Sequence, residues 1–184
     1  MKTSLDILRP EKPERNTLKL HVYRDESDGL PKYAVRRDGH LFIHLRIDWT
    51  QGNLRQYQVV VPRVGVIGTC LLDTDEPSHM TVERAPWVER LIDSAYAILC
   101  QWCDQTVRDQ EIRALEIDTI RERMAHRVNT VLNDPAIRQD PVLKALNDRL
   151  GERERKAWVA ERKQLKDAFK RTNEDVMRYN GLFR

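Results

Sequence analysis

The first third of the chain alternates between apolar and polar positions, which is the period of a β-strand. In the clearest run, every second residue from Leu41 to Trp49 is apolar, and Phe42 falls with the polar set. Shorter alternating runs occupy 18–22, 33–35 and 55–61, and Asp38-Gly39 is a strong two-residue hairpin signal. These runs predict four antiparallel strands, with the apolar piece 66–72 as a candidate fifth.

From Pro86 the apolar period changes to that of an α-helix, counted at 100° per residue. Ile112 and Leu115 fall on the face opposite the main stripe, so either the helix breaks between 104 and 116 or it has a second apolar contact there. The main stripe comprises Val88, Ile92, Ala95, Leu99, Trp102, Cys103, Ile117, Ile120, Met124, Val128 and Val131.

A second helix is predicted to begin at Asp140-Pro141, because Asp is a good N-cap and Pro suits the first helical turn. The apolar residues that follow recur in steps of mostly three, four or seven, close to the seam of a coiled coil. They are Leu143, Leu146, Leu150, Trp158, Leu165, Phe169, Thr172, Val176 and Tyr179. The short connection between the two helices predicts an antiparallel hairpin.

The predicted fold class is therefore α+β: an N-terminal antiparallel β-meander of four to five strands, followed by a long antiparallel two-helix hairpin. Residues 1–16 are expected to form a polar tail, and 17–85 the sheet region. Residues 86–184 are expected to form the hairpin, with helices at about 86–133 and 141–179 that pack with the sheet as one unit.

Composition fits this picture, because 40% apolar and 33% charged residues suit long solvated helices better than a thick core. The sequence has no apolar run long enough to span a membrane and no secretory signal pattern, and three cysteines are too few for a disulfide framework. We therefore expect a cytoplasmic protein. The net charge is −3 over 86–140 and +5 over 141–184, so we expect the two helices to attract each other.

Cys100 and Cys103 form a C-x-x-C pair, which suits redox chemistry only where the first thiol lies at a helix N-terminus. Here the pair lies deep inside the first predicted helix. Zinc needs about four ligands, and the only further candidates are Cys70 and His79 from the preceding loop. Because that spacing matches no zinc motif we recognise, we expect no metal and no cofactor. The thiols are interpreted as small packing residues, with a zinc protein or enzyme as the third alternative.

The sequence carries no nucleophile elbow, Walker loop or dinucleotide-binding motif, so we expect a protein that is not an enzyme. A row of basic residues at intervals of seven favours an alternative, a nucleic-acid-binding accessory protein. The row is Arg149, Lys156, Lys163 and Lys170, flanked by Arg155, Arg162 and Lys166. On the sheet, three aromatic residues among four arginines would also suit single-stranded nucleic acid, although ordinary strand composition explains them equally well. They are Tyr23, Phe42 and Tyr57 with Arg36, Arg37, Arg46 and Arg55.

More apolar residues are present than one two-helix seam can bury. Ile112, Leu115, Leu182 and Phe183 are the candidates for contact with a partner. The leading hypothesis is a non-enzymatic interaction protein, either an assembly subunit or a regulator. It would bind a protein partner, or a second copy of itself, through the helical hairpin and the N-terminal tail.

Overall fold

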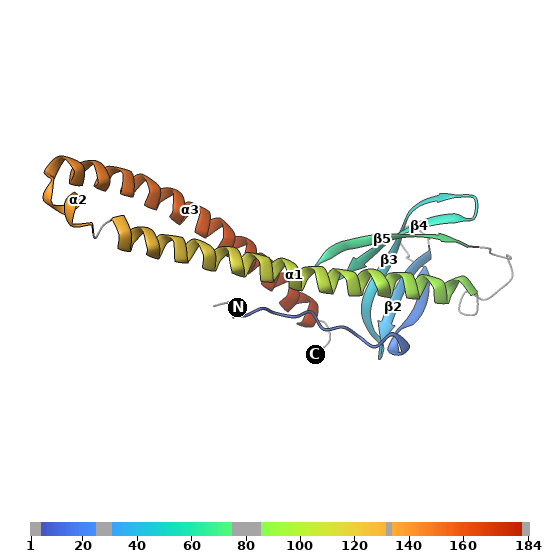
Figure 1. The fold of residues 1–184 in the computed structure, drawn as a ribbon. Coiled ribbons are helices and arrows are strands. Elements are labelled where there is room, and N and C mark those ends of the chain that lie inside the picture. The colour runs from blue at the N-terminus through green and yellow to red at the C-terminus, as the bar shows by residue number, and fades with distance from the viewer. Residues whose placement is uncertain (1–4, 25–30, 75–85, 132–133, 182–184) are drawn as a thin grey trace. The chain divides into compact units, whose positions relative to one another are not determined.

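The computed structural model describes residues 5–24, 31–74, 86–131 and 134–181. They form a five-stranded antiparallel sheet followed by two long helices (Figure 1), so the predicted α+β class is confirmed. No helix in these ranges is long and apolar enough to cross a membrane. The chain divides into two compact units. One holds the described residues of Leu8–Val107 and Glu174–Arg184, including the sheet, and the other holds those of Met1–Ile7 and Arg108–Asn173.

The strands form a meander in which each strand pairs with the next along the chain. Asp38 and Gly39 have φ values of 49° and 81°, and a type I′ hairpin requires positive φ at both central residues. The predicted hairpin is therefore confirmed, and the candidate fifth strand is present. The strands are β1 (Lys19–Arg24), β2 (Pro31–Arg37), β3 (His40–Gln51), β4 (Leu54–Val61) and β5 (Gly65–Asp73).

Phe42 is buried in the core, although the alternation along β3 placed it on the polar face. Val35 pairs with Ile43 while Arg36 pairs with Leu41, so Phe42 is an extra residue on β3. A bulge of this kind interrupts the alternation of side chains between the two faces. The prediction for Phe42 was wrong because periodicity alone does not reveal a bulge.

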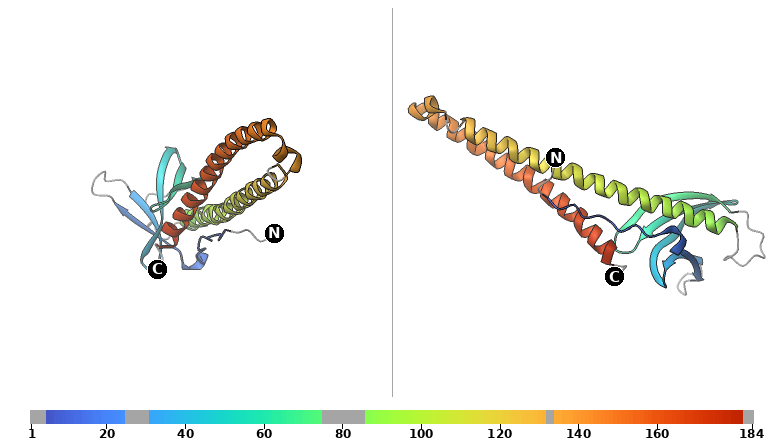
Figure 2. Two further views of the ribbon diagram at one scale, coloured as in Figure 1. Left: turned by 90° about the vertical axis from the view of Figure 1, so that its left-hand side faces the viewer. Right: turned by 60° about the horizontal axis from the view of Figure 1, so that its bottom comes forward.

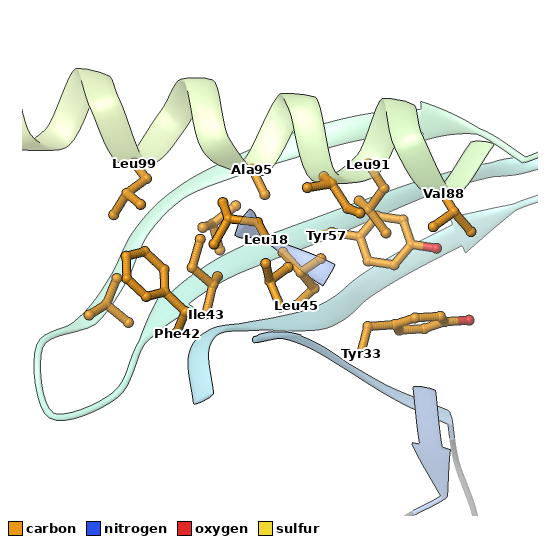
Figure 3. Packing of buried hydrophobic residues seen from close by; sticks show 14 of the residues in the cluster. Leu18, Tyr33, Phe42, Ile43, Leu45, Tyr57, Val88, Leu91, Ala95 and Leu99 are labelled. Carbon is orange, nitrogen blue, oxygen red and sulfur yellow. The ribbon is translucent and has the colours of Figure 1, made fainter. Parts of the chain in front are cut away.

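The first half of α1 (Pro86–Val131) covers one face of the sheet (Figure 1). Figure 3 shows side chains of α1 pointing onto apolar residues of β2, β3 and β4. This burial is the main source of stability in the unit, at about 25 cal/mol for each Å² of apolar surface removed from water. The core includes Val88, Leu91, Ile92, Ala95, Leu99 and Cys103 of α1 with Tyr33, Val35, Phe42, Ile43, Leu45, Tyr57 and Val59 of the sheet.

The connection between the long helices contains a short helix that was not predicted, α2 (Pro135–Gln139). α3 (Pro141–Asn180) begins where the sequence indicated. The carboxylate of Asp140 accepts hydrogen bonds from the backbone N–H of Val142 at 2.8 Å and of Leu143 at 3.2 Å. Asp140 therefore satisfies two of the N–H groups that a helix start leaves without a partner.

In the second unit, α1 and α3 run antiparallel (Figure 1 and the right-hand view of Figure 2), as the short connection predicted. Ala114 and Ile117 of α1 pack against Phe169 of α3, and Leu5 and Leu165 border this small core. α1 does not break between 104 and 116, which settles the alternative left open by the sequence.

Candidate interaction surfaces

Three leucines on the first turns of α3 form an exposed stripe. Leu143, Leu146 and Leu150, called here the α3 leucine stripe, have exposed fractions of 48%, 56% and 54%. Phe169, further along the same helix, is only 8% exposed. The steps of three and four residues place the three leucines on one side of the helix.

The α3 leucine stripe does not continue the line of residues that contacts α1. At 100° per residue, the direction of Leu150 differs by about 80° from that of Trp158, which is half-buried on the side of Phe169. The leucines were expected to lie in the seam with α1. That prediction was wrong, because the stripe drifts by about a quarter turn along α3.

Two of the four predicted partner-contacting residues are exposed on α1. Ile112 and Leu115 are 54% and 42% exposed, on the face opposite to buried Gln110, Ala114 and Ile117. The other two, Leu182 and Phe183, lie outside the described residues. The apolar groups available for contact therefore lie on both helices of the hairpin, with the larger set on α3.

The basic row lies on the outer side of α3. Its four residues, Arg149, Lys156, Lys163 and Lys170, are all exposed. Intervals of seven residues rotate the row by only about 20° per repeat, so it stays on one side of the helix. Of the flanking residues, Arg155 and Lys166 are exposed and Arg162 is half-buried.

Some side chains in and beside the basic row are already paired with acidic side chains or hydrogen-bonded to backbone oxygens. Lys156 forms an ion pair with Glu152 at 3.3 Å, and the Arg155 Nε donates to the backbone oxygen of Gly151 at 3.1 Å. A shallow depression of about 460 Å³ lies here, lined by Glu152, Arg155, Lys156 and Val159. The row is thus accessible, but its charge is mixed.

Two of the three aromatic residues proposed to stack with nucleic acid on the sheet are not accessible. Phe42 and Tyr57 are buried beneath α1. The opposite face of β3 and β4 carries a polar network, in which Asp48 accepts hydrogen bonds from the side-chain amides of Gln56 and Gln58, each at 2.8 Å. The prediction that Phe42 and Tyr57 stack with single strands is therefore wrong, and the side chain of the third residue, Tyr23, lies outside the described ones.

Residues 8–18, called here the strap, lie against the chain's own helices. Pro10, Pro13 and Leu18 are buried. Lys12 forms an ion pair with Asp104 of α1 at 2.6 Å, and this hydrogen-bonded contact raises the pKa of Lys12. Partner binding by the N-terminal tail stays a prediction; in the structure the strap contacts the chain's own helices.

The strap also pairs with acidic side chains of α1, the helix whose acidic residues were expected to face α3. Arg15 pairs with Glu89 at 2.6 Å and with Asp93 at 2.5 Å on α1. In the hairpin, one ion pair joins Arg127 of α1 to Glu154 of α3, so here the basic residue lies on the first helix. The acidic start of α1 therefore attracts the N-terminal segment.

Two of the three cysteines are held as thiols by burial. Burial raises the pKa of both Cys70 and Cys103 to about 11. Cys70 lies on β5 and not in the loop where it was expected, and Cys100 is half-buried on α1. His79 lies outside the described residues, within which no group of three His, Cys, Asp or Glu side chains has metal-binding geometry.

The residues that hold the strap were not predicted from the sequence. Tyr179 was assigned only to the apolar seam, and Asn180 only to the C-cap of the second helix, together with Gly181. A signal was present in the sequence, because Pro10 and Pro13 are three residues apart and a polyproline II helix has three residues per turn. Both prolines therefore point to one side of an extended segment.

No family model, curated protein or solved structure matches this chain, so its function has to be argued from its own residues.

Proposed function

We propose that this is a non-enzymatic interaction protein that binds a protein partner through the helical hairpin. The observation that carries the proposal is the exposed α3 leucine stripe. Exposed leucines are ordinary when scattered singly, but three on one side of a helix form a contiguous apolar surface. Such a surface accepts an apolar helix face, with residues three and four apart as anchors.

The size of the stripe sets the kind of contact it can make. Complete burial of a leucine contributes about 1.5–3 kcal/mol, so burying the exposed half of three leucines contributes roughly 3 kcal/mol. Association costs about 4–15 kcal/mol in lost freedom of motion. The contact must therefore extend to neighbours such as Val142, which is 76% exposed, and the aliphatic stem of Arg153.

The experiment compares two charged double variants of the full chain in affinity capture from the native host. L146E/L150E places carboxylates in the stripe, and K156E/K163E reverses two charges of the basic row. We expect captured protein to be lost from the first variant and retained by the second. Equal capture by L146E/L150E and the wild type would contradict the proposal.

The accessible basic row supports nucleic-acid binding as a second candidate function. Its four cations repeat at intervals near 10 Å along α3, which suits contacts to successive phosphates. In this case K156E/K163E would bind nucleic acid more weakly than the wild type, and the remaining affinity for nucleic acid would depend less on the salt concentration. L146E/L150E would bind nucleic acid as the wild type does. The same two variants therefore separate the two functions.

A further inference from the structure

The end of α3 recognises the backbone of the strap. The Asn180 side chain accepts a hydrogen bond from the backbone N–H of Glu11 at 2.9 Å and donates to the backbone oxygen of Arg9 at 3.1 Å. The Tyr179 hydroxyl donates to the backbone oxygen of Glu11 at 3.0 Å. Three hydrogen bonds thus hold the strap without reading any of its side chains.

The side chains of the strap add a defined chemistry to this backbone recognition. Pro10 and Pro13 are both buried, one polyproline II turn apart. Glu14, which follows them, has φ −74° and ψ 131°, close to polyproline II values. Arg15–Thr17 then forms a short 3-10 helix, η1, so the proline-containing part of the strap, with its buried side, ends at Glu14.

Aromatic rings stand where the strap is held. The Tyr179 ring packs on Trp102 with centroids 5.0 Å apart and on Phe42 with centroids 6.0 Å apart. Proline-rich peptides are commonly recognised in grooves lined by aromatic residues, since their preformed conformation loses little entropy on binding. Tyr179 is buried in this aromatic cluster, and its hydroxyl donates to the backbone of the strap.

Acidic residues on α1 form ion pairs with the basic side chains of the strap. Asp104 pairs with Lys12, and Glu89 and Asp93 pair with Arg15. These contacts are substantially exposed, and exposed ion pairs are individually weak. The strap is therefore held by several individually weak contacts, and Leu18 marks the point where the chain enters the buried core.

We propose that Asp104 of α1, together with Tyr179 and Asn180 of α3, forms a binding site for a proline-rich, basic peptide of a partner protein. In the structure, residues 9–15 of the same chain occupy it as an intramolecular ligand. A tethered segment acts at an effective concentration in the millimolar range, so it blocks weaker competitors and yields to a tighter one. The strap thus keeps the site closed until such a partner arrives.

This site shares no residue with the α3 leucine stripe, so the two proposals stand or fall separately. The test uses the full chain with a protease recognition site inserted between Asn16 and Thr17, within η1, where Asn16 is exposed and Thr17 is half-buried. After cleavage, a fluorescent peptide of residues 7–16 is added and its binding is followed by anisotropy. The intact chain, in which the strap remains tethered, is the reference.

We expect the cleaved chain to exchange its own segment for the labelled peptide in a saturable reaction, with the intact chain binding at least tenfold more weakly. The exchange should weaken at least fivefold with Asp104→Lys, and with a peptide in which both prolines are replaced by Ala. Loss of the fold on cleavage, measured by circular dichroism, would overturn the proposal, because the segment would then be a structural part and not a ligand. A folded cleaved chain that binds no peptide up to millimolar concentration would also overturn it.

Discussion

At the residue scale, a glycine sets how closely α1 approaches β5. A Cβ atom on Gly68 would lie 2.6 Å from the Cγ2 of Ile98, well inside van der Waals contact. Gly68 pairs with buried Val59 and belongs to the face that α1 covers. Ile98 would therefore have to move away from the sheet to accommodate any larger residue.

Gly68→Ala should lower the free energy of unfolding by about 1–3 kcal/mol, the usual cost of overpacking a well-filled contact. Gly151→Ala is the matched control, because Gly151 lies inside α3 with its nearest neighbour atom at 3.9 Å. It should raise the free energy of unfolding by about 0.5–1 kcal/mol through helix propensity. Urea denaturation measures both, and equal effects would refute the close contact.

His44 gives β3 a defined pH dependence. Burial, and then the positive charge of Arg36, lower the pKa of His44 from its ordinary value of 6.5. The unfolded chain consequently binds the proton more readily than the folded one does. Stability that His44 contributes is complete above its unfolded pKa and is lost as the pH falls toward the folded value.

His44→Gln should therefore reduce the loss of stability between pH 7.5 and 5.5. The measurement is urea denaturation of wild type and variant at several pH values across this window. The difference between the two proteins isolates His44, because their other titrating groups are shared. A variant that loses as much stability as the wild type would show that His44 is not shielded in this way.

At the element scale, the two parts of α3 use their apolar residues differently. The part near Phe169 packs on Ala114 and Ile117 of α1, whereas the first turns present the α3 leucine stripe to solvent. One helix therefore combines a stabilising face with a face whose burial requires another molecule.

Phe169→Ala should lower the free energy of unfolding by about 3 kcal/mol, because it opens a space beside buried Ile117. Leu146→Ala should change it by less than about 0.5 kcal/mol, as for other exposed positions. Chemical denaturation followed by helical circular dichroism compares the two variants. A large loss for Leu146→Ala would mean that the α3 leucine stripe is part of the folded core.

Periodicity predicted the elements well because local packing dictates it. The apolar stripe of α1 from Val88 to Cys103 is largely buried, as expected. The strands follow their alternation except at two bulges of β3, which bury Phe42 and bring Trp49 to Gln56 on the polar face. The failures concern how elements meet. A bulge, the drift of the leucines away from α1 and the docking of the strap all depend on three-dimensional contacts between distant segments, which a one-dimensional period does not contain.

At the scale of the whole molecule, ion pairs join segments that lie far apart in the sequence, which the net charge of each segment does not show. Glu89, Asp93 and Asp104 of α1 form ion pairs with the strap, which lies far away in the sequence. Arg15 pairs with the first two and Lys12 with the third. The basic row of α3 lies on the outer side of the helix, away from the residues that pack on α1, and acidic residues are interspersed with it. The attraction between the two long helices that their net charges indicated stays a prediction, while Glu89, Asp93 and Asp104 of α1 pair with the strap.

The molecule as a whole offers separate surfaces for separate contacts. The α3 leucine stripe offers apolar area and the basic row offers positive charge, while Tyr179 and Asn180 bind the backbone of the chain's own strap. No side chain is shared among them, so each contact can be removed by substitution without altering the others.

The most direct measurement of the central claim is photo-crosslinking in the native host, with a benzophenone amino acid placed at position 146 of the full chain. We expect a discrete protein adduct, either to a second copy or to another protein, that is absent when the same group is placed at position 163 in the basic row. Crosslinking at 163 but not at 146, or none at either position, would contradict protein binding through the α3 leucine stripe.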